Sequence, residues 1–169
     1  MLRTILWIGI VVSVVFFYVQ SSKFKKAGVA DIEDYEYATT SNEARQILKS
    51  WEDVNLVRTV KTTIHYDFAF IVIYLLLMID CFNDQVTQEQ NRILNNLLRL
   101  SIALAVVVAL LDLSENFILL YNLKNPLNHI NSFWITLVKF TMAYGIVGLW
   151  IISNVKTRIG RRAKSRVSV

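Results

Sequence analysis

Four long apolar segments dominate the pattern of hydrophobic and polar positions along this chain of 169 residues. They cover about residues 4–20, 63–82, 97–121 and 131–153. Each approaches the roughly 20 residues that a helix needs to cross the hydrocarbon core of a bilayer. Because backbone groups find no water at that depth, a spanning segment must satisfy them internally, as a helix does. The pattern therefore predicts an all-α fold, a four-helix transmembrane bundle in which residues 1–169 form a single membrane domain.

The longest polar segment, residues 21–62, follows the first predicted span. Apolar residues recur in it at helical spacing, at Ala44, Ile47, Leu48, Trp51 and Val54. Thr40 and Glu43 have the spacing of a capping box at the start of this pattern. We therefore expect an amphipathic helix over about residues 41–60 in the first extramembrane loop. It would lie on the membrane surface or cover the bundle as a lid, with Trp51 as an interfacial anchor, or it would bind a partner.

Further local patterns suggest how the other spans begin, end and meet the interface. Residues 87–90 have the sequence Thr-Gln-Glu-Gln, a second capping box that predicts a third helix starting before its span. Asn125-Pro126 predicts a turn between the third and fourth spans. Trp134 and Trp150 lie near opposite ends of the fourth span, where tryptophan favours the membrane–water interface.

Composition supports the membrane class and narrows the chemistry. Hydrophobic residues make up 54% of the chain and charged residues 18%, with a mean hydropathy of +0.43. Soluble domains are nearer about 45–50% apolar and about 25% charged. The single cysteine, Cys81, excludes a disulfide scaffold and a cysteine-based zinc site. We predict no cofactor and no metal site.

The distribution of positive charge predicts the orientation. Six of the 18 lysines and arginines fall within a basic tail at residues 154–169. Under the positive-inside rule this tail is cytoplasmic, and four spans then place the N-terminus there too, in the inner membrane of a cell. Lys23, Lys25 and Lys26 follow the first span and argue against this assignment. The first segment could instead be a cleaved signal peptide, which would leave three spans with the same cytoplasmic tail.

Ionisable side chains inside the predicted spans need a separate explanation. Asp67, Asp112, Glu115 and Lys139 fall within three of the four spans. Each costs at least about 2.5–3.5 kcal/mol to place in a membrane. With a rise of about 1.5 Å per residue, these four positions reach a similar depth in one leaflet. We therefore expect the side chains to face one another inside the bundle.

Neighbouring polar residues extend this expected cluster. Asp112, Glu115 and Asn116 share one helix face, and Tyr74 on the second span lies within reach of them. Two interpretations are open: a structural ion pair that holds the bundle together, and a polar pocket open to the outer leaflet. We expect Asp112 to be the partner of Lys139, which would leave Glu115 free to meet a ligand or a proton.

Several of these positions also carry a resemblance to a family. The motifs D-F-x-F-x-x-x-Y and D-x-x-E-N correspond to Asp67 to Tyr74 and Asp112 to Asn116, with Glu36-Tyr-Ala38 and Trp51 before them. In these motifs the chain resembles an uncharacterised family of small four-span bacterial membrane proteins. A fainter likeness, in length, long first loop, intramembrane acids and basic tail, is to the sterol-isomerase and sigma-2-receptor superfamily. The first resemblance implies the four-span fold and brings no known activity.

Three classes of function are compatible with these features. The first is an outer-leaflet pocket that binds a lipid or small ligand, or passes an ion or proton. The second is an intramembrane enzyme in which Asp112 or Glu115 transfers a proton on a lipid-like substrate while Lys139 stabilises charge. The third is a structural or regulatory membrane subunit. We expect membrane lipids as partners, regard a homo-oligomer as compatible with the pattern, and expect no nucleic acid.

Overall fold

The computed structural model describes residues 1–125 and 129–167, and the side chains up to residue 157. Its helices are α1 (Leu2–Ala27), α2 (Ile32–Glu36), α3 (Ser41–Asp53), α4 (Val57–Gln88), α5 (Arg92–Lys124) and α6 (Phe133–Val167). Within this described part of the chain, α1, α4, α5 and α6 are long and apolar enough to cross a membrane. The predicted fold class is confirmed: the protein is an all-α, multi-pass membrane protein with an amphipathic helix, α3, in its first loop.

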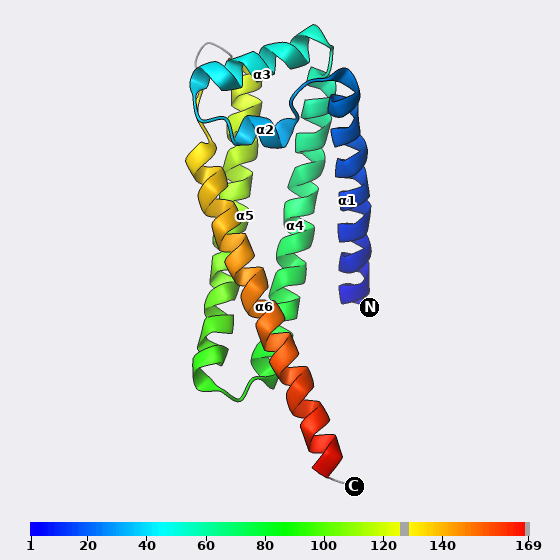
Figure 1. Cartoon of the computed structure of the whole chain (residues 1–169), viewed down its shortest axis with the longest axis vertical. Coiled ribbons are helices and arrows are strands. Elements are labelled where there is room, and N and C mark those ends of the chain that lie inside the picture. The colour runs from blue at the N-terminus through cyan, green and yellow to red at the C-terminus, as the bar shows by residue number, and fades with distance from the viewer. Residues whose placement is uncertain (126–128, 168–169) are drawn as a thin grey trace.

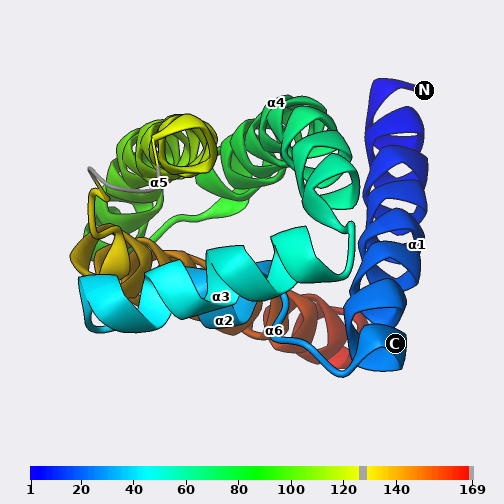
Figure 2. The ribbon, with the colours of Figure 1, turned by 90° about the horizontal axis from the view of Figure 1, so that it is seen from above.

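The long helices α4 and α5 run side by side and pack against each other more extensively than any other pair of described helices (Figure 1). Helix α1 packs mainly against α4, whereas α6 packs mainly against α5 and touches α4 less. Viewed from above, α1 stands at the edge of the bundle beside α4 (Figure 2). Side chains of α1 and α6 line a common space, and its other walls come from α4, from α5 and from residues 31–36 around α2.

Helices α2 and α3 lie across one end of the bundle and form a cap (Figures 1 and 2). Trp51 of α3 is fully buried, its ring packs against Phe24 and Tyr35, and its indole Nε1 donates a hydrogen bond to the Ala30 carbonyl at 2.7 Å. The expected lid position of this helix agrees with the structure. The expected interfacial role of Trp51 does not, because its side chain contacts protein on all sides.

The cap helix is shorter than the predicted range of 41–60. It ends at Asp53, and Asn55 then adopts a positive φ of 59°, a left-handed conformation that asparagine tolerates. This turn redirects the chain, so residues 57–60 belong to α4 instead. At the start of α3, the Thr40 hydroxyl accepts a hydrogen bond from the Glu43 amide at 3.2 Å, as the capping-box pattern predicts.

The second predicted capping box is wrong. Thr87 lies inside α4, where its hydroxyl donates to the Asp84 carbonyl at 2.8 Å. Asn91 caps α5 instead, since its side-chain oxygen accepts a hydrogen bond from the Leu94 amide at 3.1 Å. The early start of α5, before the apolar segment, agrees with the prediction. The predicted turn at Asn125-Pro126 falls partly outside the described residues, as do most side chains of the basic tail.

Polar contacts join the helices in the half of the bundle away from the cap. The Arg3 guanidinium contacts Asp80 at 2.5 Å and Asp84 at 3.0 Å, which joins the start of α1 to the far half of α4. Nearby, the Gln85 side chain bonds to Ser153 and Asn154 of α6 at 3.0 and 2.8 Å. The start of α1 and the second half of α6 therefore lie at the same end of the bundle.

The two other tryptophans expected at the interface lie in different environments. Trp134 is 71% exposed near the capped end of α6, as a side chain at a membrane interface would be. Trp150 is half-buried and packs against the apolar cluster of Phe82, Leu98 and Ile146 near the opposite end. Only Trp134 therefore presents most of its ring to the surroundings of the protein.

Candidate functional site

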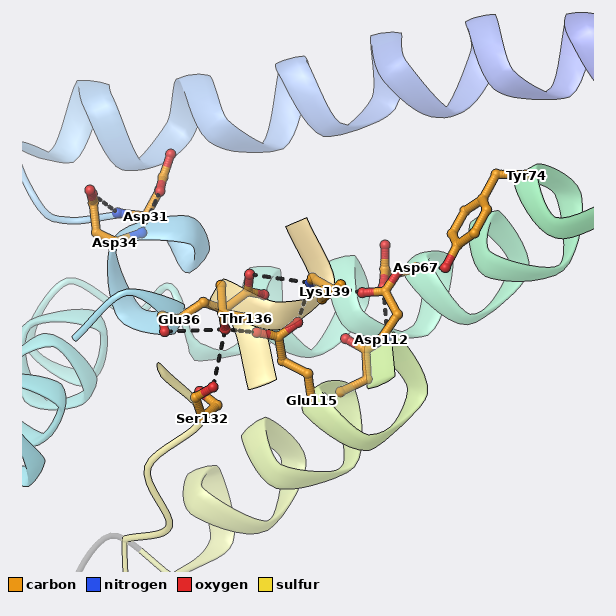
Figure 3. Close-up of polar contacts among 11 residues, drawn as sticks. Asp31, Asp34, Glu36, Asp67, Tyr74, Asp112, Glu115, Ser132, Thr136 and Lys139 are labelled. Carbon is orange, nitrogen blue, oxygen red and sulfur yellow. Dashed lines mark hydrogen bonds and ion pairs between the residues drawn. The ribbon is translucent and has the colours of Figure 1, made fainter. Parts of the chain in front are cut away.

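The buried ammonium of Lys139 lies at the centre of a polar cluster beneath the cap (Figure 3). Its Nζ is 2.9 Å from Oδ1 of Asp112, in direct contact with Glu115, and 3.9 Å from Oε2 of Glu36. Lys139 is only 6% exposed. These contacts join α6 to two consecutive turns of α5 and to the end of α2.

Glu115 is the most deeply buried acid of this cluster, with 1% of its surface exposed. Its carboxylate accepts hydrogen bonds from Lys139 and from the Thr136 hydroxyl. The expectation that Glu115 is free for a ligand is therefore wrong, and Asp112 is not the exclusive partner of Lys139. Because Asp112 and Glu115 are three residues apart on one helix face, a single lysine opposite that face reaches both.

Asp112 and Asp67 receive their remaining hydrogen bonds from neutral side chains. The Tyr74 hydroxyl of α4 donates to Oδ2 of Asp112 at 3.0 Å, so both oxygens of that carboxylate are bonded. Asn116 of α5 donates to Oδ2 of Asp67 at 2.6 Å. Among the described residues no cationic side chain is within ion-pair distance of Asp67. The structure therefore brings together the six residues predicted for the site: Asp67, Tyr74, Asp112, Glu115, Asn116 and Lys139.

Glu36 also belongs to the site, which its position in the polar first loop did not indicate, although this residue is part of the motif resemblance. It is the last residue of α2, a short helix whose N-terminus is fixed by reciprocal hydrogen bonds between Asp31 and Asp34. Burial raises the pKa of Glu36 well above its ordinary value, the Glu115 carboxylate raises it further, and Lys139 opposes this shift. The D-x-x-D spacing of Asp31 and Asp34 is the signal that could have revealed α2.

Negative charge exceeds positive charge in this cluster. In the described part of the chain, the four carboxyl groups of Glu36, Asp67, Asp112 and Glu115 lie near the single ammonium of Lys139. A buried carboxylate without a counter-charge is costly, and it takes up a proton or acquires a cationic partner instead. Lys139 is already in contact with Asp112 and Glu115, so Glu36 and Asp67 are the groups that need another source of positive charge.

A cavity of about 720 Å³ adjoins the polar cluster. Glu36, Asp67, Asp112 and Lys139 line one part of it, whereas Glu115 is not among its lining residues. The rest of the wall is largely apolar and includes Val14 and Phe17 of α1, Phe70, Leu77 and Met78 of α4, and Phe140 and Ala143 of α6. The cavity therefore combines an acidic part with aromatic and aliphatic walls, and it lies where α1 and α6 face each other.

No family model, curated protein or solved structure matches the chain. Within the described residues, no group of three or more histidine, cysteine or acidic side chains is placed to hold a metal ion.

Replacing Lys139 by methionine tests the energetic role of the cluster. Lys139→Met leaves two buried carboxylates without their ammonium, and removing one partner of a buried ion pair typically costs about 3–5 kcal/mol. We expect a lower melting temperature in detergent, partly restored by a second substitution. Glu115→Gln should restore more than Asp112→Asn, because Glu115 is the more deeply buried acid.

The matched control is Lys124→Met, which removes an exposed lysine at the end of α5 and should leave the melting temperature nearly unchanged. Equal melting temperatures for Lys139→Met and this control would contradict the buried ion pairs.

Proposed function

We propose that the protein binds an amphipathic small molecule or a lipid in the cavity between α1 and α6. The observation that carries this proposal is a cavity of about 720 Å³ whose largely apolar wall includes several ionisable side chains. Ligand sites in proteins typically measure about 300–1,000 Å³ and combine apolar walls with a few polar groups. An amphipathic molecule would place its polar head against Asp67 and Asp112 and its apolar part along the remaining wall.

The position of the cavity favours a ligand that comes from the membrane. Helix α1 packs mainly against α4 and presents most of its apolar side chains, such as Ile8, Val12 and Val15, to the surroundings. Since α1 and α6 are not extensively packed together, a molecule dissolved in the bilayer could enter between them.

Passage of an ion or proton across the whole membrane has less support. The polar contacts extend along α4 from Asp67 to Tyr74. Beyond them, Phe82, Leu98, Val108 and Ile146 form an apolar cluster in the half of the bundle away from the cap. A path for charge through the protein would have to cross this cluster, so a binding site open from one side is the better interpretation.

An intramembrane enzyme remains an alternative proposal, but the residues that would transfer the proton differ from those expected from the sequence. Asp112 and Glu115, the expected proton carriers, are both in contact with Lys139. Asp67 and Glu36, which line the cavity and have weaker partners, would be the better candidates for proton transfer. A structural or regulatory role would not require the cavity, and no contact within the described residues favours it.

For the orientation, we propose that the cap faces outwards and that both termini are cytoplasmic, in the inner membrane of a bacterial cell. The basic residues of the C-terminal tail and the resemblance to a bacterial family support this assignment. The acidic part of the cavity would then lie in the outer leaflet, near the cap.

Filling the cavity tests the proposed binding. Ala143 lines the cavity on α6, and Ala143→Trp would occupy part of the space with an indole ring. Native mass spectrometry of gently extracted protein should show a retained amphipathic molecule in the wild type and its loss in this variant. Ala103→Trp is the matched control, since Ala103 is exposed on α5 and does not line the cavity. Absence of any retained molecule in the wild type, or equal retention in both variants, would contradict the proposal.

Thiol labelling tests the proposed orientation. Cys81 lies near the end of α4 that contacts Arg3, and we expect a membrane-impermeant thiol reagent to reach it only from the cytoplasmic side. In a Cys81→Ser background, Lys49→Cys on the exposed face of α3 should label only from outside. Labelling of Cys81 in intact cells would reverse the orientation.

A further inference from the structure

Asp67 is an acid of the cavity wall that has no cationic partner among the described residues. Asp112 and Glu115 contact Lys139, whereas Asp67 accepts one hydrogen bond, from the neutral amide of Asn116. Its carboxylate lines the cavity, so a molecule inside the cavity can approach it. A positively charged group placed there would supply the counter-charge that the described part of the protein does not provide.

The other charged residues of the cavity wall also favour a positively charged ligand. Besides Asp67 and Asp112, the lining includes Asp31, Glu33 and Glu36 from the cap, and Lys139 is the only basic residue among the lining residues described. An excess of acidic groups around a largely apolar space attracts cations and disfavours anions. Lys139 does not offset this preference, because two carboxylates already surround its ammonium.

Aromatic rings lie next to these acids on the same wall. Phe17 of α1 contacts Phe70 of α4 at a centroid distance of 5.3 Å, and Phe70 contacts Tyr74 at the same distance. Phe70 follows Asp67 by three residues, so its ring lies on the same helix face as the carboxylate. Aromatic faces combined with a nearby carboxylate are the groups with which proteins recognise substituted ammonium ions.

From these observations we infer that the ligand of the cavity is a cationic amphiphile, an alkylammonium whose head contacts Asp67 and the rings of Phe17, Phe70 and Tyr74. Its alkyl part extends along the apolar wall formed by Val14, Leu77, Met78, Val108 and Ala143. This inference rests on the proposed binding function and adds the charge of the ligand and the residue that receives it. A phosphate or sulfate head is excluded from the same place by repulsion from Asp67 and Asp112.

The test compares three probes of equal chain length: decyltrimethylammonium, 1-decanol and decyl sulfate. Binding is measured by calorimetry on the full chain in nanodiscs of zwitterionic lipid, and empty nanodiscs give the partition background. We expect decyltrimethylammonium to bind at least about tenfold more tightly than decanol, with decyl sulfate the weakest. Ala143→Trp should abolish the protein-dependent binding of all probes.

Substitutions of residues that would contact the ammonium head test whether Asp67 receives its charge. Asp67→Asn should weaken the binding of decyltrimethylammonium by about 30-fold relative to the binding of decanol, since it removes one partner of a buried charge pair. Phe70→Leu should also lower the preference for the cation, and it provides the test if Asp67→Asn does not fold. Glu52→Gln is the matched control, because it removes an exposed negative charge outside the cavity and should leave the preference unchanged.

The outcomes separate this inference from the proposed function. Equal binding of the cation and decanol, blocked by Ala143→Trp, would overturn the cationic ligand and leave the binding function in place. An unchanged preference for the cation in both Asp67→Asn and Phe70→Leu would also overturn it. No protein-dependent binding of any probe would overturn both.

Discussion

The contact of the Lys139 ammonium with Asp112 and Glu115 is the interaction on which the rest of this bundle depends. All three side chains are largely withdrawn from solvent, so each charge is tolerable only while its partner stays in place. The contact fixes α6 against α5 at one depth. It also brings Lys139 within 3.9 Å of Glu36, which connects the cap to the helices below it.

The same contact determines which groups are left for a ligand. Because Lys139 lies against the two acids of α5, Glu36 and Asp67 have no comparable partner and line a cavity that α1 covers from one side. The apolar cluster around Phe82 and Leu98 closes the opposite half of the bundle. An acidic part near the cap and an apolar wall accessible beside α1 together favour an amphipathic ligand over a pathway through the protein.

The sequence predicted the fold and most of the cluster because both depend on local periodicity. Bilayer-length apolar segments specify the four long helices, and the cost of intramembrane charge implies that Asp67, Asp112 and Lys139 meet. Glu36 and the burial of Trp51 were missed because both depend on how the first loop folds back over the bundle. That path depends on the positive φ of Asn55 and on contacts with residues distant in sequence, which no helical periodicity encodes.

The central claim is that the cluster holds more buried carboxyl groups than Lys139 can neutralise, so that the surplus is protonated until a cation binds. Infrared difference spectroscopy of the carbonyl stretch of protonated carboxyl groups measures this directly. At neutral pH the ligand-free protein should show this band, Glu36→Gln should reduce it, and decyltrimethylammonium should weaken it in the wild type. Absence of the band from ligand-free wild-type protein would contradict the account.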